Sequence, residues 1–147
     1  MKKNGIKVLV VEDFHTYANT IGKLLEKNGY TVYLLMDFKG NFWAKAREFN
    51  ADIALLDHDL RCSFTGRDIA EGLKLPAARS ISITSVYFDT SSYCASGWSM
   101  KEWLCEGGFF KAKQRNEAKK SLVDTVKILR CETLKPRRSD DLRGNFI

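Results

Sequence analysis

The stretch Ala51–Leu60, which reads Ala-Asp-Ile-Ala-Leu-Leu-Asp-His-Asp-Leu, decides the fold of this chain. Its centre is an unbroken apolar run from Ile53 to Leu56, and Asp57 ends the run. A short apolar run bounded by acids is typical of a parallel strand that is buried on both faces. Open parallel sheets bind their ligands at the carboxyl ends of the strands, so we expect Asp57 to lie in a functional site. The alternative is that Asp57 only ends the strand or caps a helix.

Strand-like and helix-like segments alternate along the rest of the chain. Besides Ala51–Asp57, the predicted strands are Ile6–Val11, Tyr30–Leu35, Ser80–Thr84 and Gly107–Lys111. The predicted helices are Phe14–Asn28, a helix between Gly40 and Ala51, Gly66–Leu75, Ser99–Cys105 and Glu117–Leu129. This alternation predicts an α/β fold, a flavodoxin-like doubly wound sheet of five parallel strands in the order 2-1-3-4-5 with helices on both faces. We expect residues 1–130 to form one domain, followed by a tail, 131–147, of unknown role.

Composition and charge limit the classes of protein to which this chain could belong. The chain has 147 residues, is 44% hydrophobic and contains no apolar run long enough to span a membrane. Its four cysteines lack the spacing of a metal site, which predicts reduced thiols in a cytoplasmic protein. The segment Lys111–Arg130 holds seven Lys and Arg residues against Glu117 and Asp124. We interpret it as the solvated face of a helix, because no aromatic platform or nucleic-acid-binding motif accompanies it.

The acids that follow two of the strands predict a metal site. In the strand order 2-1-3-4-5, the first and third strands are neighbours, which brings Glu12 and Asp13 next to Asp57. Three carboxylates in one pocket repel one another, and a bound cation removes the conflict. Ligands that are all oxygens favour Mg²⁺ with several retained waters. The alternative is that one or two of these acids point outward as helix caps.

Thr84 and Lys111 complete the predicted site. Thr84 ends the predicted fourth strand, and Lys111 ends the predicted fifth strand after Phe109 and Phe110. A hydroxyl and an ammonium beside a metal-bound carboxylate are the groups that would hold a phosphoryl group on Asp57. Taken singly, each residue could be an ordinary strand residue.

Together these residues resemble a bacterial response-regulator receiver domain of a two-component system. The resemblance covers about residues 5–130 and is carried by Val8–Asp13, Ala54–Leu60 with Gly66, Ile83–Ser85 and Gly108–Lys111. It implies that Asp57 accepts a phosphoryl group from a histidine kinase or phosphotransfer protein. It further implies that Asp13, Asp57 and the Asp59 carbonyl bind Mg²⁺ with Glu12 assisting, and that Thr84 and Lys111 bind the phosphoryl oxygens. Any catalysis would be limited to the domain's own phosphorylation and dephosphorylation.

The chain also departs from the family pattern. Ala112 stands where the family has a proline after the lysine, and Gly108 stands where it has an aromatic residue, so Phe109 is the candidate switch residue. Trp98 and Trp103 fall on the expected output face, where we predict that a downstream protein or a second copy of the chain binds. The competing interpretation places both tryptophans in the core.

Two other functions remain open on the sequence alone. The first is a pseudo-receiver, a scaffold that binds proteins without phosphorylation. The second is a phosphatase of the haloacid dehalogenase type, since Asp57-His58-Asp59 resembles its nucleophile motif. That family carries its Asp-x-Asp motif on the first strand, whereas here two strands precede it.

Overall fold

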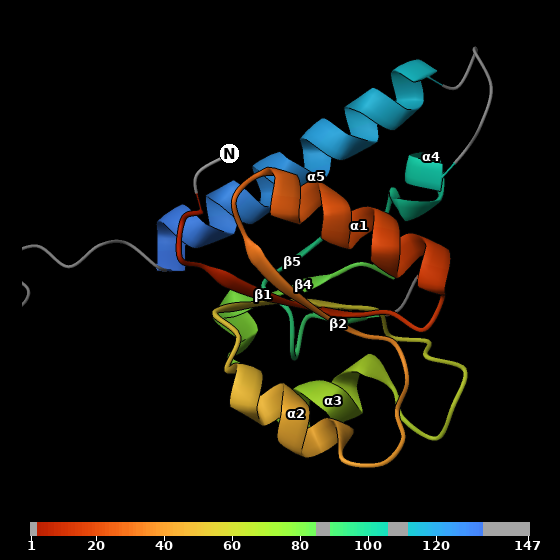
Figure 1. The fold of residues 1–147 in the computed structure, drawn as a ribbon, viewed down its shortest axis with the longest axis vertical. Helices are drawn as coiled ribbons and strands as arrows, with labels where there is room; N and C mark the ends of the chain where they lie inside the picture. Colours follow the sequence, from red (N-terminus) through yellow and green to blue (C-terminus); the bar gives the residue numbers. More distant parts are fainter. Residues whose placement is uncertain (1–2, 85–88, 106–111, 134–147) are drawn as a thin grey trace, which may run out of the picture.

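The computed structural model describes residues 3–84, 89–105 and 112–133. At its centre is a five-stranded sheet in the order β2-β1-β3-β4-β5, in which every neighbouring pair is parallel (Figure 1). The strands are β1 (Lys7–Val11), β2 (Thr31–Leu35), β3 (Ile53–Leu56), β4 (Ser80–Ser82) and β5 (Ser96–Gly97). The predicted fold class and strand order are therefore confirmed.

Helices cover both faces of this sheet (Figure 1). On one face lie α2 (Phe42–Phe49) and α3 (Gly66–Gly72). On the other lie α1 (His15–Lys27), α4 (Lys101–Cys105) and α5 (Ala112–Thr133). A short 3₁₀ turn, η1 (Ala77–Arg79), leads into β4.

The side chains of β1 show how the sheet separates two cores. Val8 and Val10 pack with the α1, α4 and α5 side, whereas Leu9 and Val11 pack with the α2 and α3 side. Successive side chains of a strand point to opposite faces, so a continuous apolar run supplies both cores at once. All four residues are at most 1% exposed, as expected for a central parallel strand.

The fifth strand differs from its prediction. Ser96–Gly97 pairs with β4 and occupies the sheet edge that the sequence analysis gave to Gly107–Lys111. The segment 106–111 lies outside the described residues. The observed strand has only two residues, both exposed, so it carries none of the apolar signal by which buried strands are recognised. The predicted helix Ser99–Cys105 therefore follows the fifth strand as α4, instead of preceding it.

The last helix is longer than predicted. α5 runs from Ala112 to Thr133, beyond both ends of the predicted helix Glu117–Leu129. The predicted apolar stripe is nevertheless buried throughout, at Ala118, Leu122, Val126 and Leu129. Residues 131–133 continue the helix past the expected domain end at 130, and the remainder of the predicted tail lies outside the described residues.

Candidate functional site

Three carboxylates meet at the carboxyl edge of the sheet. Glu12 and Asp13 follow β1 directly, and Asp57 follows β3 directly. β1 pairs with β3 so that Val11 lies opposite Leu56, and the Asp57 N–H donates to the Val11 carbonyl at 2.9 Å. One oxygen from each of the three carboxylates lies within 4.8 Å of the others. The pairing of the two strands therefore brings together the acids that the sequence placed at one edge.

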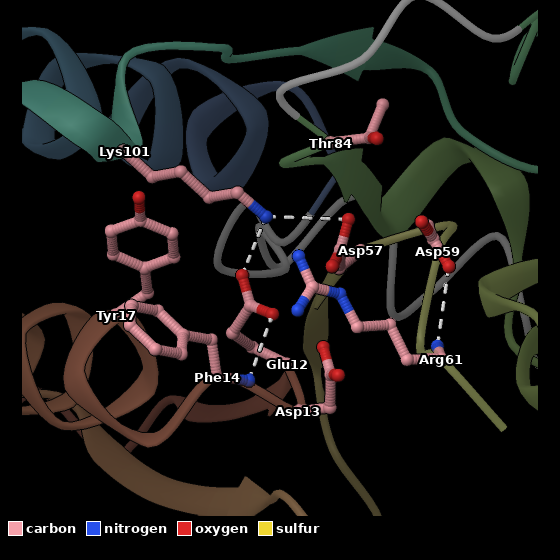
Figure 2. A pocket seen from close by; sticks show the side chains of 9 residues that line it. All are labelled: Glu12, Asp13, Phe14, Tyr17, Asp57, Asp59, Arg61, Thr84 and Lys101. Atoms are coloured by element: carbon pink, nitrogen blue, oxygen red, sulfur yellow. Dashed lines mark hydrogen bonds and ion pairs between the residues drawn. The ribbon is translucent and has the colours of Figure 1, made fainter.

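A buried lysine, Lys101, joins two of these acids. It begins α4, and its Nζ lies 2.5 Å from Glu12 Oε1 and 3.3 Å from Asp57 Oδ1 (Figure 2). All three residues are at most 5% exposed. Burying charges is costly unless they are paired, and this lysine provides the pairing.

Lys101 is not among the residues predicted for the site. The lysine predicted there is Lys111, which lies outside the described residues, because the fifth strand was expected at 107–111. The resemblance to receiver domains offers a sequence signal that identifies Lys101. It expects an aromatic residue three positions before the lysine, and Trp98 precedes Lys101 by that interval.

Burial has a strong electrostatic effect on Glu12. It raises the pKa of the carboxyl from 4.5 to about 8, because the charged form is poorly solvated there and Asp57 adds repulsion. The hydrogen bond from Lys101 acts in the opposite direction and lowers the pKa. The other oxygen, Glu12 Oε2, accepts a 3.3 Å hydrogen bond from the Phe14 N–H. Glu12 is thus engaged at both oxygens, whereas Asp13 is only partly buried and lines the open pocket.

The acids open into a pocket of about 370 Å³ (Figure 2). Its lining contains the predicted residues Thr84 and Asp59. It also contains residues that the sequence analysis did not name for the site: Phe14, Tyr17, Arg61 and Lys101. The Lys101 ammonium lies 5.5 Å from the centre of the Tyr17 ring, which adds a cation–π contact to its ion pairs. Phe14 and Tyr17 make an edge-to-face pair, and Phe14 is 51% exposed.

The loop after Asp57 is fixed by close packing at its far end. A side chain at Gly66 would meet the Asp57 carbonyl oxygen and would come within 3.1 Å of the His58 Cα, so only glycine fits there. The next helix begins with a capping box between Thr65 and Asp68. Phe64 packs on the rings of two α2 residues, Phe42 and Trp43.

His58 links the acceptor strand to the segment that precedes β5. Its Nδ1 lies 2.7 Å from the hydroxyl of Tyr93, which is itself buried. Burial raises the pKa of the Tyr93 hydroxyl, so this group stays protonated near neutral pH. The contact ties the residue after Asp57 to residues 89–95, two segments that are distant in the sequence.

The two tryptophans of the predicted output face have different surroundings. Trp98 is only 4% exposed and belongs to the core beneath α1, α4 and α5. The prediction of an exposed interface residue is therefore wrong for Trp98, whose Nε1 has no hydrogen-bond partner among the described residues. Trp103, on α4, is 40% exposed and accessible to a partner, so the interface prediction stays a prediction for this residue. Phe109, the predicted switch residue, lies outside the described residues.

Within the described ranges, the helices are too short or too polar to cross a lipid bilayer.

Comparison with known proteins identifies the class of fold. No family model matches the sequence, and no curated protein matches it. Among solved structures, one similar chain is a receiver domain from Methanospirillum hungatei, with 16% identity and a TM-score of 0.58 over 86% of this chain and 98% of that chain. A second is the receiver domain of a modulated diguanylate cyclase from Desulfovibrio desulfuricans, with 23% identity and a TM-score of 0.52 over 83% of this chain and 96% of that chain. A third is a response regulator from Thermotoga maritima in complex with Mg²⁺ and beryllofluoride, with 20% identity and a TM-score of 0.51 over 78% of this chain and 97% of that chain. The chain therefore has the fold of a response-regulator receiver domain.

Proposed function

We propose that this protein is a phosphoacceptor receiver domain, in which Asp57 accepts a phosphoryl group from a histidine kinase or phosphotransfer protein. The observation that carries the proposal is the buried triad of Lys101, Glu12 and Asp57 at the carboxyl edge of the sheet. Buried ionisable groups with specific charge partners beside an open pocket are typical of functional sites. The edge at which they lie is where open parallel sheets carry their chemistry.

The donor set fits Mg²⁺. Asp13 and Asp57 offer carboxylate oxygens close to one another, and Asp59 lines the same pocket. Oxygen donors of this kind suit a hard divalent cation that keeps several waters. Asp13 and Asp57 would hold the ion, and the Asp59 carbonyl would add a ligand. Glu12 would assist these ligands in binding the metal. When bound, the ion supplies positive charge beside the phosphoryl oxygens. The solved Thermotoga maritima response regulator contains Mg²⁺ with beryllofluoride, which supports this assignment.

Each residue then has a defined role in accepting the phosphoryl group. An Asp57 oxygen is the nucleophile that attacks phosphorus. Lys101, already 3.3 Å from Asp57 Oδ1, would move its ammonium onto a phosphoryl oxygen and compensate its charge. Thr84, in the lining of the same pocket, would donate a hydrogen bond to another oxygen. Lys101 thus takes the role that the sequence analysis gave to Lys111.

Phosphorylation of Asp57 could change the protein surface through Lys101 and α4. Once Lys101 binds a phosphoryl oxygen, its pairing with Glu12 weakens and α4, which Lys101 begins, is free to shift. α4 carries the exposed Trp103 and packs against α5. We propose that this α4–α5 face binds the downstream protein or a second copy of the chain.

Incubation with acetyl phosphate and Mg²⁺, followed by intact-mass measurement, tests the phosphoacceptor function. We expect the mass of one phosphoryl group to be added to the wild type and none to Asp57→Asn. Equal labelling of both proteins would refute Asp57 as the acceptor. No labelling of either, with Mg²⁺ bound, would favour the pseudo-receiver scaffold.

A further inference from the structure

Arg61 extends across the pocket from the loop that follows the acceptor strand. Figure 2 shows its side chain turned back from the loop, with the guanidinium end directed toward Asp57. Its backbone has φ of 52°, a left-handed conformation that non-glycine residues rarely adopt. Strained backbone of this kind persists where the surrounding structure holds it and is concentrated at functional sites.

The surrounding loop holds this conformation. The Arg61 N–H donates to Asp59 Oδ1 at 3.2 Å, and Asp59 forms an antiparallel bridge with Thr65. Phe64 anchors the same loop on α2 through its ring contacts with Phe42 and Trp43. These contacts hold the backbone turn from which the Arg61 side chain extends.

The charges in the pocket distinguish Arg61 from Lys101. Lys101 is buried and already paired with two carboxylates, whereas Arg61 is exposed and forms no ion pair within the part of the chain that the structure describes. Arg61 and the acids line the same pocket of about 370 Å³. A guanidinium offers a planar set of donors that matches the oxygens of a phosphoryl group. An unpaired guanidinium that faces the acceptor across an open pocket is placed to contact an anion entering there.

We infer that Arg61 is a phosphodonor-binding residue, whose guanidinium contacts the phosphoryl oxygens while the group is delivered to Asp57. The inference deepens the proposed function and rests on it. With an acyl phosphate as donor, an Asp57 oxygen forms a new bond to phosphorus. The bond from phosphorus to the acyl oxygen breaks, and the carboxylate leaves with the electron pair. No oxidant, reductant or proton is required. Arg61 approaches from the solvent side and Lys101 from the protein interior, so the transferring charge is held from two sides.

The test compares four proteins: wild type, Arg61→Gln, Arg61→Lys and Arg67→Gln. Arg67 is the matched control, because it pairs with Glu71 on the surface of α3 and does not line the pocket. The rate of acetyl phosphate labelling is measured by intact mass as a function of donor concentration, at constant ionic strength. Binding of Mn²⁺, as a spectroscopic stand-in for Mg²⁺, is measured in parallel by electron paramagnetic resonance. Circular dichroism verifies that each variant is folded.

We expect Arg61→Gln to raise the donor concentration that gives half the maximal rate by about tenfold, equivalent to about 1.4 kcal/mol of lost donor binding. Arg61→Lys should recover part of the loss, because it keeps the charge but not the planar donors. Arg67→Gln should match the wild type, and Mn²⁺ affinity should be the same in all four proteins.

Three results would overturn the inference. Unchanged donor dependence in Arg61→Gln, with normal labelling of the wild type, would refute the role of Arg61 and leave the proposed function standing. Tighter Mn²⁺ binding by Arg61→Gln without a change in donor dependence would show that Arg61 competes with the metal instead. Absence of labelling in every protein would refute the proposed function and the inference together.

Discussion

Replacement of Lys101 by methionine would remove the charge that joins the two buried acids while keeping most of the side-chain volume. Lys101 is 3% exposed, and Glu12 and Asp57 are 1% and 5% exposed, so water reaches none of them well. Breaking a buried ion pair by removing one partner typically costs about 3–5 kcal/mol. Glu12 has a pKa of about 8 and can bind a proton, which relieves part of this cost. We therefore expect Lys101→Met to lower the free energy of unfolding by about 3 kcal/mol at pH 7.

Urea denaturation followed by circular dichroism, in metal-free buffer, measures this loss. The loss should grow as pH rises through 8, because Glu12 then gives up its proton and Lys101 is the charge that stabilises its carboxylate. Lys113→Met is the control, because Lys113 is exposed on α5 and its replacement should change the stability by less than about 0.5 kcal/mol.

A double variant tests whether the loss arises at the ion pair. Glu12→Gln combined with Lys101→Met should be markedly more stable than the sum of the two single effects predicts, because neither variant residue is charged. A Lys101→Met protein as stable as the wild type at pH 7 would contradict the reasoning, since the two acids would then not depend on this lysine.

The same structure makes two further predictions about stability. Between pH 4.5 and 8, Glu12 keeps a proton in the folded protein but loses it in the unfolded chain, because folding raises its pKa. The free energy of unfolding therefore falls as pH rises from 4.5 to 8. Relative to Glu12→Gln, which lacks this titration, the fall should be on the order of 4 kcal/mol in metal-free buffer. Urea denaturation across the pH range measures it. If the free energies of unfolding of the two proteins depend on pH in parallel, Glu12 ionises with its ordinary pKa and the prediction is wrong. Gly66→Ala should cost about 2–3 kcal/mol and slow phosphorylation of Asp57, because the new Cβ would press on the Asp57 carbonyl. In the control Gly97→Ala the new Cβ would lie 3.9 Å from the Ser82 carbonyl oxygen, an ordinary contact, so stability should change little. Equal melting temperatures for both variants would refute the packing argument.

The central part of the fold could be predicted from local patterns. β1 and β3 are continuous apolar runs that end in acids, and a buried parallel strand has this pattern whatever surrounds it. The strand order follows from the alternation of strands and helices, and it places Glu12 and Asp13 beside Asp57. This part was predictable because each step depended on one element or on one pair of neighbours.

The lysine could not be placed in the same way. β5 consists of Ser96 and Gly97, two exposed residues whose pairing with β4 depends on backbone hydrogen bonds and leaves no apolar pattern. The apolar residues at 107–110 offered a stronger strand signal, and that signal moved the expected site lysine to Lys111. Arg61 was missed for a different reason. It lies on a loop with a left-handed turn that is anchored by the packing of Phe64, and the hydrophobic periodicity of the sequence predicts neither feature.

A crystal structure of the full chain with Mg²⁺ and beryllofluoride tests the central claim most directly. The account predicts that beryllium is bonded to an Asp57 oxygen, that the metal lies on Asp13 and Asp57, and that the Lys101 Nζ contacts a fluorine. Beryllofluoride bound at Asp57 with Lys111 on the fluorine and Lys101 still between Glu12 and Asp57 would contradict the assignment of Lys101. Crystals of the same composition with neither metal nor beryllofluoride in the pocket would contradict the phosphoacceptor function itself.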